Sequence, residues 1–204
     1  GDFVNEFPVL KNENVNFVRL NIFPDGGIAR LRLLGDLTPW TLETGKETEL
    51  SSLLNGGKII GYNNAHYGDV NALLSEGRGK TMGDGWETRR RRVSGHDYII
   101  IELGVPGHIS KIEVDTCHFK GNFPDRASIQ TINIPSDVKE KKNFDNSESW
   151  DFILNEQKCS ADTVHTYKQE DLLHDKPVSH VRLNIYPDGG VSRLRIYGNS
   201  ADRR

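Results

Sequence analysis

The chain has 204 residues, enough for one full domain or for one domain and part of another. Hydrophobic residues make up 35% of it, and 3 Trp, 6 Tyr and 8 Phe can anchor a core, which argues against a disordered chain. The net charge of −3 argues against non-specific binding to nucleic acid or to a membrane surface. The longest apolar run is only Tyr98–Ile101, whereas a membrane-spanning helix needs about 20 residues.

An internal repeat dominates the organisation of the chain. Residues 18–35 (VRLNIFPDGGIARLRLLG) and 181–198 (VRLNIYPDGGVSRLRIYG) are identical at 13 of 18 positions, at an offset of 163 residues. Such an offset is the length of a domain rather than of a solenoid repeat. The sequence therefore predicts that residues 1–37 are the C-terminal tail of a preceding copy and that residues 38–204 are a complete copy. Because two strands are not expected to fold alone, we expect a fragment or short form of a longer protein.

The repeated segment itself predicts a β-hairpin. In the second copy Val181, Leu183 and Ile185 alternate with polar side chains, which is the period of a half-buried strand. Residues 187–190 (PDGG) have the composition of a turn, and the alternation then resumes. Duplication alone explains why the turn occurs twice, so a structural role of its aspartate, Asp188, stays open beside a functional one.

Several other short stretches predict strands, separated by segments rich in glycine, proline and asparagine. The predicted strands are Tyr98–Leu103, Ile109–Asp115, Ala127–Ile134, Glu148–Leu154 and Thr163–Tyr167. A short helix is expected at Asp69–Ser75 and a surface loop at Lys139–Ser149. Many short strands without a strong helical period favour an all-β fold, an antiparallel β-sandwich.

The densest polar segment, residues 82–97, contains candidates for catalysis. Asp84 and Glu87 could act as general base or acid, and the arginines at 89–92 could bind a carboxylate through two hydrogen bonds. The alternative is a solvated loop that leads into the next strand, with Trp86 covering the core. Four basic residues in a net acidic chain support nucleic-acid binding only weakly.

Histidine and cysteine give no recognisable motif. The seven histidines lack the spacing of a helical zinc site, so no metal ligands are predicted, although a metal held by distant strands stays open. Cys117 is expected to be a buried, unreactive thiol. Two cysteines form no disulfide framework, which favours a reducing compartment.

Five segments, in this order and spacing, resemble the allantoicase (allantoate amidinohydrolase) family across nearly the whole chain. They are Tyr62–Gly68, Asp84–Arg90 (DGWETRR), Gly95–Asp97, Val114–Pro124 and Arg182–Arg195. Allantoicases have two such repeats, each similar to a galactose-binding-like jelly-roll, so the resemblance implies this fold here. It also implies hydrolysis of allantoate to ureidoglycolate and urea in allantoin degradation, a part of purine metabolism. Most of the first repeat, including its own DGWET segment, does not occur in this sequence.

The chemistry of allantoate gives these segments hypothetical roles. The catalytic candidates are Asp84 or Glu87 as the base and His96 or His118 as the acid. Arginine suits the carboxylate of allantoate, and Asn, Asp and other polar groups suit its ureido groups. The candidates for substrate binding are Trp86, Arg89, Arg90, Asn122, Arg182, Asp188 and Arg193. The sequence requires no cofactor, and a divalent metal that activates water stays open.

Two alternatives to the enzyme stay open, a non-catalytic jelly-roll that binds a ligand and an inactive, truncated allantoicase. The expected partner is a small-molecule substrate, allantoate. Neither nucleic acid nor a membrane is expected, and a homo-oligomer stays open. No targeting signal is visible, and the expected location is intracellular, cytoplasmic or peroxisomal.

Overall fold

The computed structural model describes residues 4–11, 13–15, 17–28, 31–35, 45–134 and 144–201. The chain divides into two compact units, Gly1–Thr38 and Pro39–Arg204. Within the described part of the chain, no helix has the length and the apolar character needed to cross a membrane.

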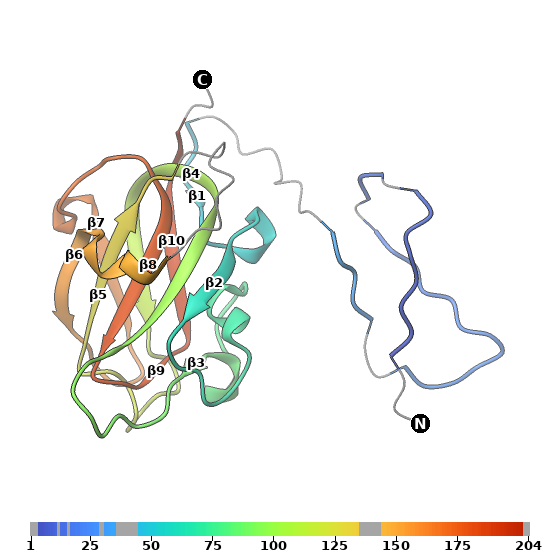
Figure 1. Ribbon diagram of the computed structural model, residues 1–204, viewed down its shortest axis with the longest axis horizontal. Helices are drawn as coiled ribbons and strands as arrows, with labels where there is room; N and C mark the ends of the chain where they lie inside the picture. Colours follow the sequence, from blue (N-terminus) through green and yellow to red (C-terminus); the bar gives the residue numbers. More distant parts are fainter. Residues whose placement is uncertain are drawn as a thin grey trace. The chain divides into compact units, whose positions relative to one another are not determined.

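The second unit is built from strands and short 3₁₀ turns (Figure 1). The strands are β1 Thr48–Glu49, β2 Lys58–Tyr62, β3 Trp86–Glu87, β4 Asp97–Asp115, β5 Arg126–Ile132, β6 Asp151–Lys158, β7 Val164–Lys168, β8 Val178–Tyr186, β9 Gly190–Val191 and β10 Arg193–Ser200. The 3₁₀ turns are η1 Leu53–Asn55, η2 Val70–Leu74, η3 Met82–Asp84, η4 Phe144–Ser149 and η5 Gln169–Asp171. Every strand pair is antiparallel, as predicted.

The long strand β4 belongs to both layers of the sandwich. Its first part pairs with β2 and β8, and the sheet continues through β5 to β6. Its second part pairs with β10 and β7, and β1 extends this sheet beyond β10. The register with β8 shifts between Glu102 and Gly107, where the strand passes from one layer to the other. Pro106 in this stretch has no N–H to donate to a ladder.

The core lies between these layers. Ile99 and Ile101 of β4 and Leu183 of β8 contribute from one sheet, and Ile112 of β4 and Leu194 of β10 contribute from the other. All five are fully buried. The alternation seen in the sequence therefore places one face of each strand in the core, as the period of two requires.

The predicted β-hairpin at 181–198 is wrong. β8 pairs with β4 and β5, whereas β10 pairs with β4 and β1, and no ladder among the described residues joins β8 to β10. Residues 187–190 instead carry the chain from one sheet to the other. Alternation identifies a strand but not its partner, and both edges of β8 are already occupied.

The other local predictions succeed to different degrees. The expected strands Tyr98–Leu103 and Ile109–Asp115 are two parts of β4, and the other three overlap β5, β6 and β7. The expected helix at Asp69–Ser75 is the 3₁₀ turn η2, where the Asp69 side chain accepts the Asn71 N–H at 2.9 Å. Of the expected loop Lys139–Ser149, residues 139–143 lie outside the described part, and the remainder forms η4.

The first unit has no strand or helix among its described residues. Val18, Leu20 and Ile22 are 52%, 49% and 43% exposed. The equivalent residues of the second copy lie in β8 and are fully buried. The same local sequence therefore forms a buried strand only where the rest of the repeat surrounds it.

Candidate active site

Two segments with separate sequence motifs meet at one end of the sandwich. β3, from the DGWETRR segment, pairs with β9, from the PDGG segment, in the register Trp86–Val191 and Glu87–Gly190. The Thr88 N–H also donates to the Gly189 carbonyl at 3.0 Å. A bridge between Tyr67 and Glu87 adds the Tyr62–Gly68 segment to the same place. We call this region, formed by residues 62–68, 84–97, 117–125 and 186–190, the loop end.

The two glycines of the PDGG segment are required by close packing. A Cβ on Gly190 would lie inside 3.0 Å of three carbon atoms of the fully buried Phe119 ring. Gly189 has φ +141°, and a Cβ there would lie 2.6 Å from the Pro124 nitrogen. Only glycine permits this approach of the 186–190 and 117–125 segments, so the motif is needed for the architecture of the loop end.

Glu87 is the carboxylate at the centre of the loop end. Its Oε1 accepts a hydrogen bond from Asn122 Nδ2 at 2.5 Å. The Asn122 carbonyl in turn accepts the Gly190 N–H at 2.8 Å, and the Glu87 carbonyl accepts the His66 N–H at 2.8 Å. Glu87 and Asn122 are both only partly buried. The structure thus brings together two predicted site residues and fixes the direction of the carboxylate.

Asp188 orders the arginine loop. Its Oδ2 accepts the Arg91 N–H at 2.9 Å, and the Arg91 guanidinium forms an ion pair of 2.6 Å with the fully buried Asp97. Asn64 Nδ2 also donates to Asp97, at 3.3 Å. Asn64 and Asp97 lie in motif segments but are not among the predicted site residues. Arg91 could not be predicted either, because nothing in the run 89–92 shows which arginine has a buried partner.

Arg89 and Arg90 lie on the same loop and differ from Arg91. Both side chains are exposed. Within the part of the chain that the structure describes, neither guanidinium takes part in an ion pair like that of Arg91, so both groups face solvent at the loop end. An exposed guanidinium of this kind is suited to bind a carboxylate that arrives from solution.

Trp86 has no surface for a ligand. Its side chain is fully buried, and its indole Nε1 donates to the Asn64 carbonyl at 2.9 Å. This agrees with the alternative in which the tryptophan covers the core. This burial and this hydrogen bond favour a structural role for Trp86 at the loop end over the predicted contact with a substrate.

Asp84 is held by the backbone of its own loop. Its Oδ2 accepts the N–H groups of Lys80 at 2.8 Å and Thr81 at 3.0 Å, and these bonds lower the pKa of its carboxyl. A lowered pKa makes a weaker base. These contacts favour a structural role for Asp84.

Two further predicted residues, His118 and Arg193, bind backbone carbonyls of the segment 77–85. His118 Nε2 lies 2.7 Å from the Gly79 carbonyl oxygen. The Arg193 guanidinium donates to the carbonyls of Gly77 and Asp84, and also to that of its neighbour at 192. Both side chains therefore hold this segment against the sandwich, and Nε and Nη1 of Arg193 already donate within the protein.

His96 lies directly before β4 and belongs to a polar network on the outer face of the first sheet. Its Nε2 is 3.1 Å from Asn184 Oδ1, and its ring lies against Tyr186 with 4.6 Å between centroids. Asn184 Nδ2 donates to Ser128 and Gln130, so its oxygen is the acceptor and His96 Nε2 has the proton. In the neutral ring the lone pair is therefore on Nδ1.

Arg182, two residues before Asn184 on β8, is a deeply buried charge outside these hydrogen bonds. It is 1% exposed, and none of its three guanidinium nitrogens has a hydrogen-bond partner. The guanidinium lies 4.0 Å from the centroid of the Tyr98 ring, and the exposed Glu148 carboxylate is 3.6 Å from Nη2. Arg182 is therefore closed to solvent, unlike the exposed arginines of the loop end.

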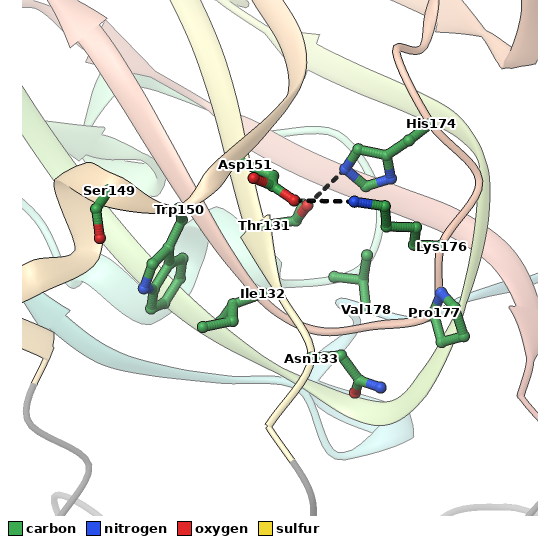
Figure 2. Close-up of a pocket in the computed structure, with 10 residues that line it drawn as sticks. All are labelled: Thr131, Ile132, Asn133, Ser149, Trp150, Asp151, His174, Lys176, Pro177 and Val178. Atoms are coloured by element: carbon green, nitrogen blue, oxygen red, sulfur yellow. Dashed lines mark hydrogen bonds and ion pairs between the residues drawn. The ribbon is translucent and has the colours of Figure 1, made fainter.

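A pocket that no sequence motif predicts lies elsewhere, where the segments 131–133, 149–151 and 174–178 meet (Figure 2). It has a volume of about 470 Å³. His174 and Thr131 form a 3.2 Å hydrogen bond at its wall, and Lys176 pairs with Asp151 at 3.1 Å. Burial lowers the pKa of His174. None of the predicted site residues lines this pocket, which three distant segments create only after folding.

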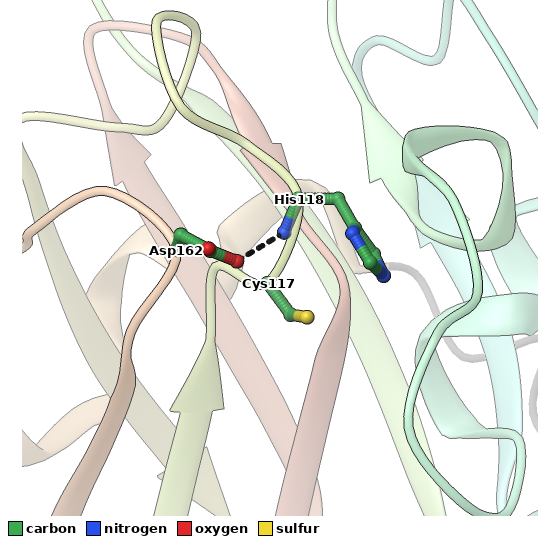
Figure 3. A group of neighbouring side chains, drawn as sticks. All are labelled: Cys117, His118 and Asp162. Atoms are coloured by element: carbon green, nitrogen blue, oxygen red, sulfur yellow. Dashed lines mark hydrogen bonds between the residues drawn. The ribbon is translucent and has the colours of Figure 1, made fainter.

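One group of side chains could hold a metal ion. Cys117, His118 and Asp162 each place one ligand atom within 4.8 Å of the other two (Figure 3). The sequence predicts no metal ligands, because its histidines lack the spacing of a helical zinc site, and His118 and Asp162 are 44 residues apart in the chain.

Comparison with known proteins places these segments in a family. A family model described as "Allantoicase repeat" matches residues 1–38 and 48–201. A "Probable allantoicase" of Acinetobacter baylyi is 47% identical over 192 residues, which cover 94% of this chain and 57% of that protein. The crystal structure of allantoicase from Saccharomyces cerevisiae is similar with a TM-score of 0.67 at 34% identity, over 80% of this chain and 45% of that one.

More distant structures share the fold alone. A family 32 carbohydrate-binding module from C. perfringens, solved in complex with galactose, aligns with a TM-score of 0.51 at 12% identity. It covers 74% of this chain and 99% of that chain. The predicted jelly-roll of the galactose-binding-like type is thereby confirmed.

The chain spans a little more than half the length of the curated relatives it matches. The family model covers both the repeated tail and nearly all of the second unit. The chain therefore belongs to the allantoicase family.

Proposed function

We propose that this chain takes part in the hydrolysis of allantoate to ureidoglycolate and urea, and that the loop end is where allantoate binds. Membership of the allantoicase family supports the reaction. The pairing of β3 with β9 supports the location, because it brings two segments with the family's motifs to one surface beside an oriented carboxylate.

Glu87 is the proposed general base. The reaction breaks one C–N bond at the central carbon of allantoate, the carbon gains the hydroxyl of water, and the nitrogen leaves in urea with the second proton of that water. A base must therefore take a proton from water. Glu87 is partly exposed, and its hydrogen bond from Asn122 fixes its direction without neutralising it.

His96 is the proposed general acid. The leaving nitrogen needs a proton, and histidine is the side chain that most readily exchanges one near neutral pH. Since Nε2 donates to Asn184, Nδ1 is the ring nitrogen that can take up and release the second proton. Exposed Arg89 and Arg90 are the proposed ligands of the substrate carboxylate.

The repeat supports a further part of the proposal. Residues 1–37 are proposed to be the tail of a preceding copy, whose apolar strand residues would be buried by the rest of that copy. An intracellular location and a small-molecule partner, allantoate, belong to the same proposal. The mass of the natural polypeptide tests whether a further copy is present.

Urea release from allantoate tests the proposed site. We expect the 204-residue chain to release urea and the Glu87→Gln variant to be slower by about 10²- to 10⁴-fold. Glu170→Gln, which changes an exposed carboxylate in η5, is the matched control and should keep the activity. Equal rates for Glu87→Gln and the wild type would remove Glu87 from the mechanism. No urea from a chain that circular dichroism shows to be folded would refute a complete site within this chain and favour the ligand-binding alternative.

A further inference from the structure

The end of β4 and the start of β7 bring three metal-binding side chains together. Cys117 and His118 closely follow the last residue of β4, and Asp162 precedes β7. Two backbone contacts join these two turns. Asp115 pairs with Val164, and the Thr116 N–H donates to the Thr163 carbonyl at 2.9 Å. The arrangement is therefore fixed by backbone pairing of the sandwich rather than by a free loop.

The tautomer of His118 leaves a nitrogen lone pair available. His118 Nε2 lies 2.7 Å from the Gly79 carbonyl oxygen, which can only accept, so Nε2 has the proton. In the neutral ring, Nδ1 then has a free lone pair. A histidine that binds a metal usually donates its other N–H to a carbonyl or a carboxylate in this way, which fixes both the tautomer and the ring direction.

Cys117 and Asp162 supply a sulfur and a carboxylate. Cys117 is only 4% exposed, and the thiolate is the form that binds a metal, so metal binding would release the thiol proton. Asp162 is exposed at the rim, and Oδ1 accepts the His118 N–H at 2.8 Å.

We propose that Cys117, His118 and Asp162 form a binding site for a divalent transition metal, with Zn²⁺ the ion that fits best. One sulfur, one imidazole nitrogen and one carboxylate oxygen are the donor types that Zn²⁺ takes, whereas Mg²⁺ and Ca²⁺ prefer oxygen donors alone. A thiolate and a carboxylate together balance the charge of a divalent ion. Three protein ligands leave the fourth tetrahedral position for water or another small ligand.

Cobalt is the probe, because a thiolate bound to Co²⁺ gives a charge-transfer absorption. We expect the reduced 204-residue chain to bind one equivalent of Co²⁺ with this absorption, and Zn²⁺ to displace it. Cys117→Ser should abolish the absorption. Cys159→Ser is the matched control, because Cys159 is also free and buried but lies outside the cluster, and this variant should keep the absorption. An equal absorption in Cys117→Ser, or none in the wild type, would overturn the proposal.

A second variant covers the outcome in which Cys117→Ser does not fold. Asp162 is exposed, and Asp162→Asn keeps an oxygen that can accept the His118 N–H. Calorimetric titration with Zn²⁺ should show binding weakened by at least about tenfold, the lower range for loss of a supporting residue. Unchanged Zn²⁺ affinity in Asp162→Asn would also overturn the proposal. Neither measurement depends on urea release, so failure here is distinct from failure of the proposed function.

Discussion

Replacing Gly190 by alanine should damage the loop end through a single methyl group. The new Cβ would overlap the ring of Phe119, which is fully buried and cannot move aside into solvent. Gly190 is also half of β9, so a shift that relieves the overlap must disturb its pairing with Glu87. Overpacking of this kind typically costs about 1 to 3 kcal/mol of unfolding free energy.

Thermal unfolding gives the corresponding shift. For a domain of this size, about 1 kcal/mol lowers Tm by roughly 2 to 4 °C, so Gly190→Ala should lower Tm by about 2 to 12 °C. The chain contains its own control, because Gly27 is the equivalent residue of the first copy, and a Cβ added there would meet no atom within 4 Å. Gly27→Ala should leave Tm unchanged.

Phe119→Leu tests whether overlap with the Phe119 ring causes the loss of stability in Gly190→Ala. In the Gly190→Ala background the smaller side chain should recover part of the lost stability, whereas in the wild type it should only destabilise. Such a sign difference is a coupling energy between two residues in contact. Equal Tm values for Gly190→Ala and Gly27→Ala, or no coupling with Phe119→Leu, would refute the packing argument.

Two further predictions concern charged side chains whose burial and hydrogen bonds could not be predicted from the sequence. Arg182→Met should leave the unfolding free energy unchanged or raise it by about 1 kcal/mol or more in a denaturant titration. The reason is that the guanidinium is buried without hydrogen bonds and its acidic neighbour Glu148 is exposed. A loss above about 3 kcal/mol would contradict this reasoning. The pKa of Asp84 is lower in the folded chain than its ordinary value, so its carboxylate stabilises the fold above about pH 4. This stabilisation is lost as the pH falls through the folded pKa. Asp84→Asn should therefore show a smaller decrease in Tm on acidification than the wild type. Parallel acid profiles of the wild type and Asp84→Asn would contradict that assignment.

Strand positions could be predicted because they depend on the local pattern of apolar residues, an apolar run or an alternation. The predicted strands at 98–103 and 109–115 are both present, and both contribute apolar side chains to the core, among them Ile99, Ile101 and Ile112. Partners could not be predicted, because alternation is the same whichever strand lies alongside. This is why the segment at 181–198 resembles a hairpin in sequence, although β4 lies between its two strands.

For the site residues, too, the sequence predicts where they lie but not which contacts each side chain makes. The motifs located the loop end, since Glu87, Asn122 and Asp188 all lie there. They could not separate Arg91, which pairs with buried Asp97, from its exposed neighbours. They also could not reveal that the Arg193 guanidinium donates to backbone carbonyls, because those carbonyls come from a loop more than 100 residues away.

The two copies of the repeat separate what a segment encodes from what its surroundings add. Residues 18–22 and 181–185 have the same sequence, yet only the second copy forms a strand with buried side chains. In that copy β4 and β5 satisfy the backbone on both edges, and the opposite sheet covers the apolar face. An alternating segment is therefore a necessary part of the fold but not a sufficient one. The same reasoning applies to the loop end, because β3 and β9 are only two residues long and need the packed segments around Phe119 to bring Glu87 into position.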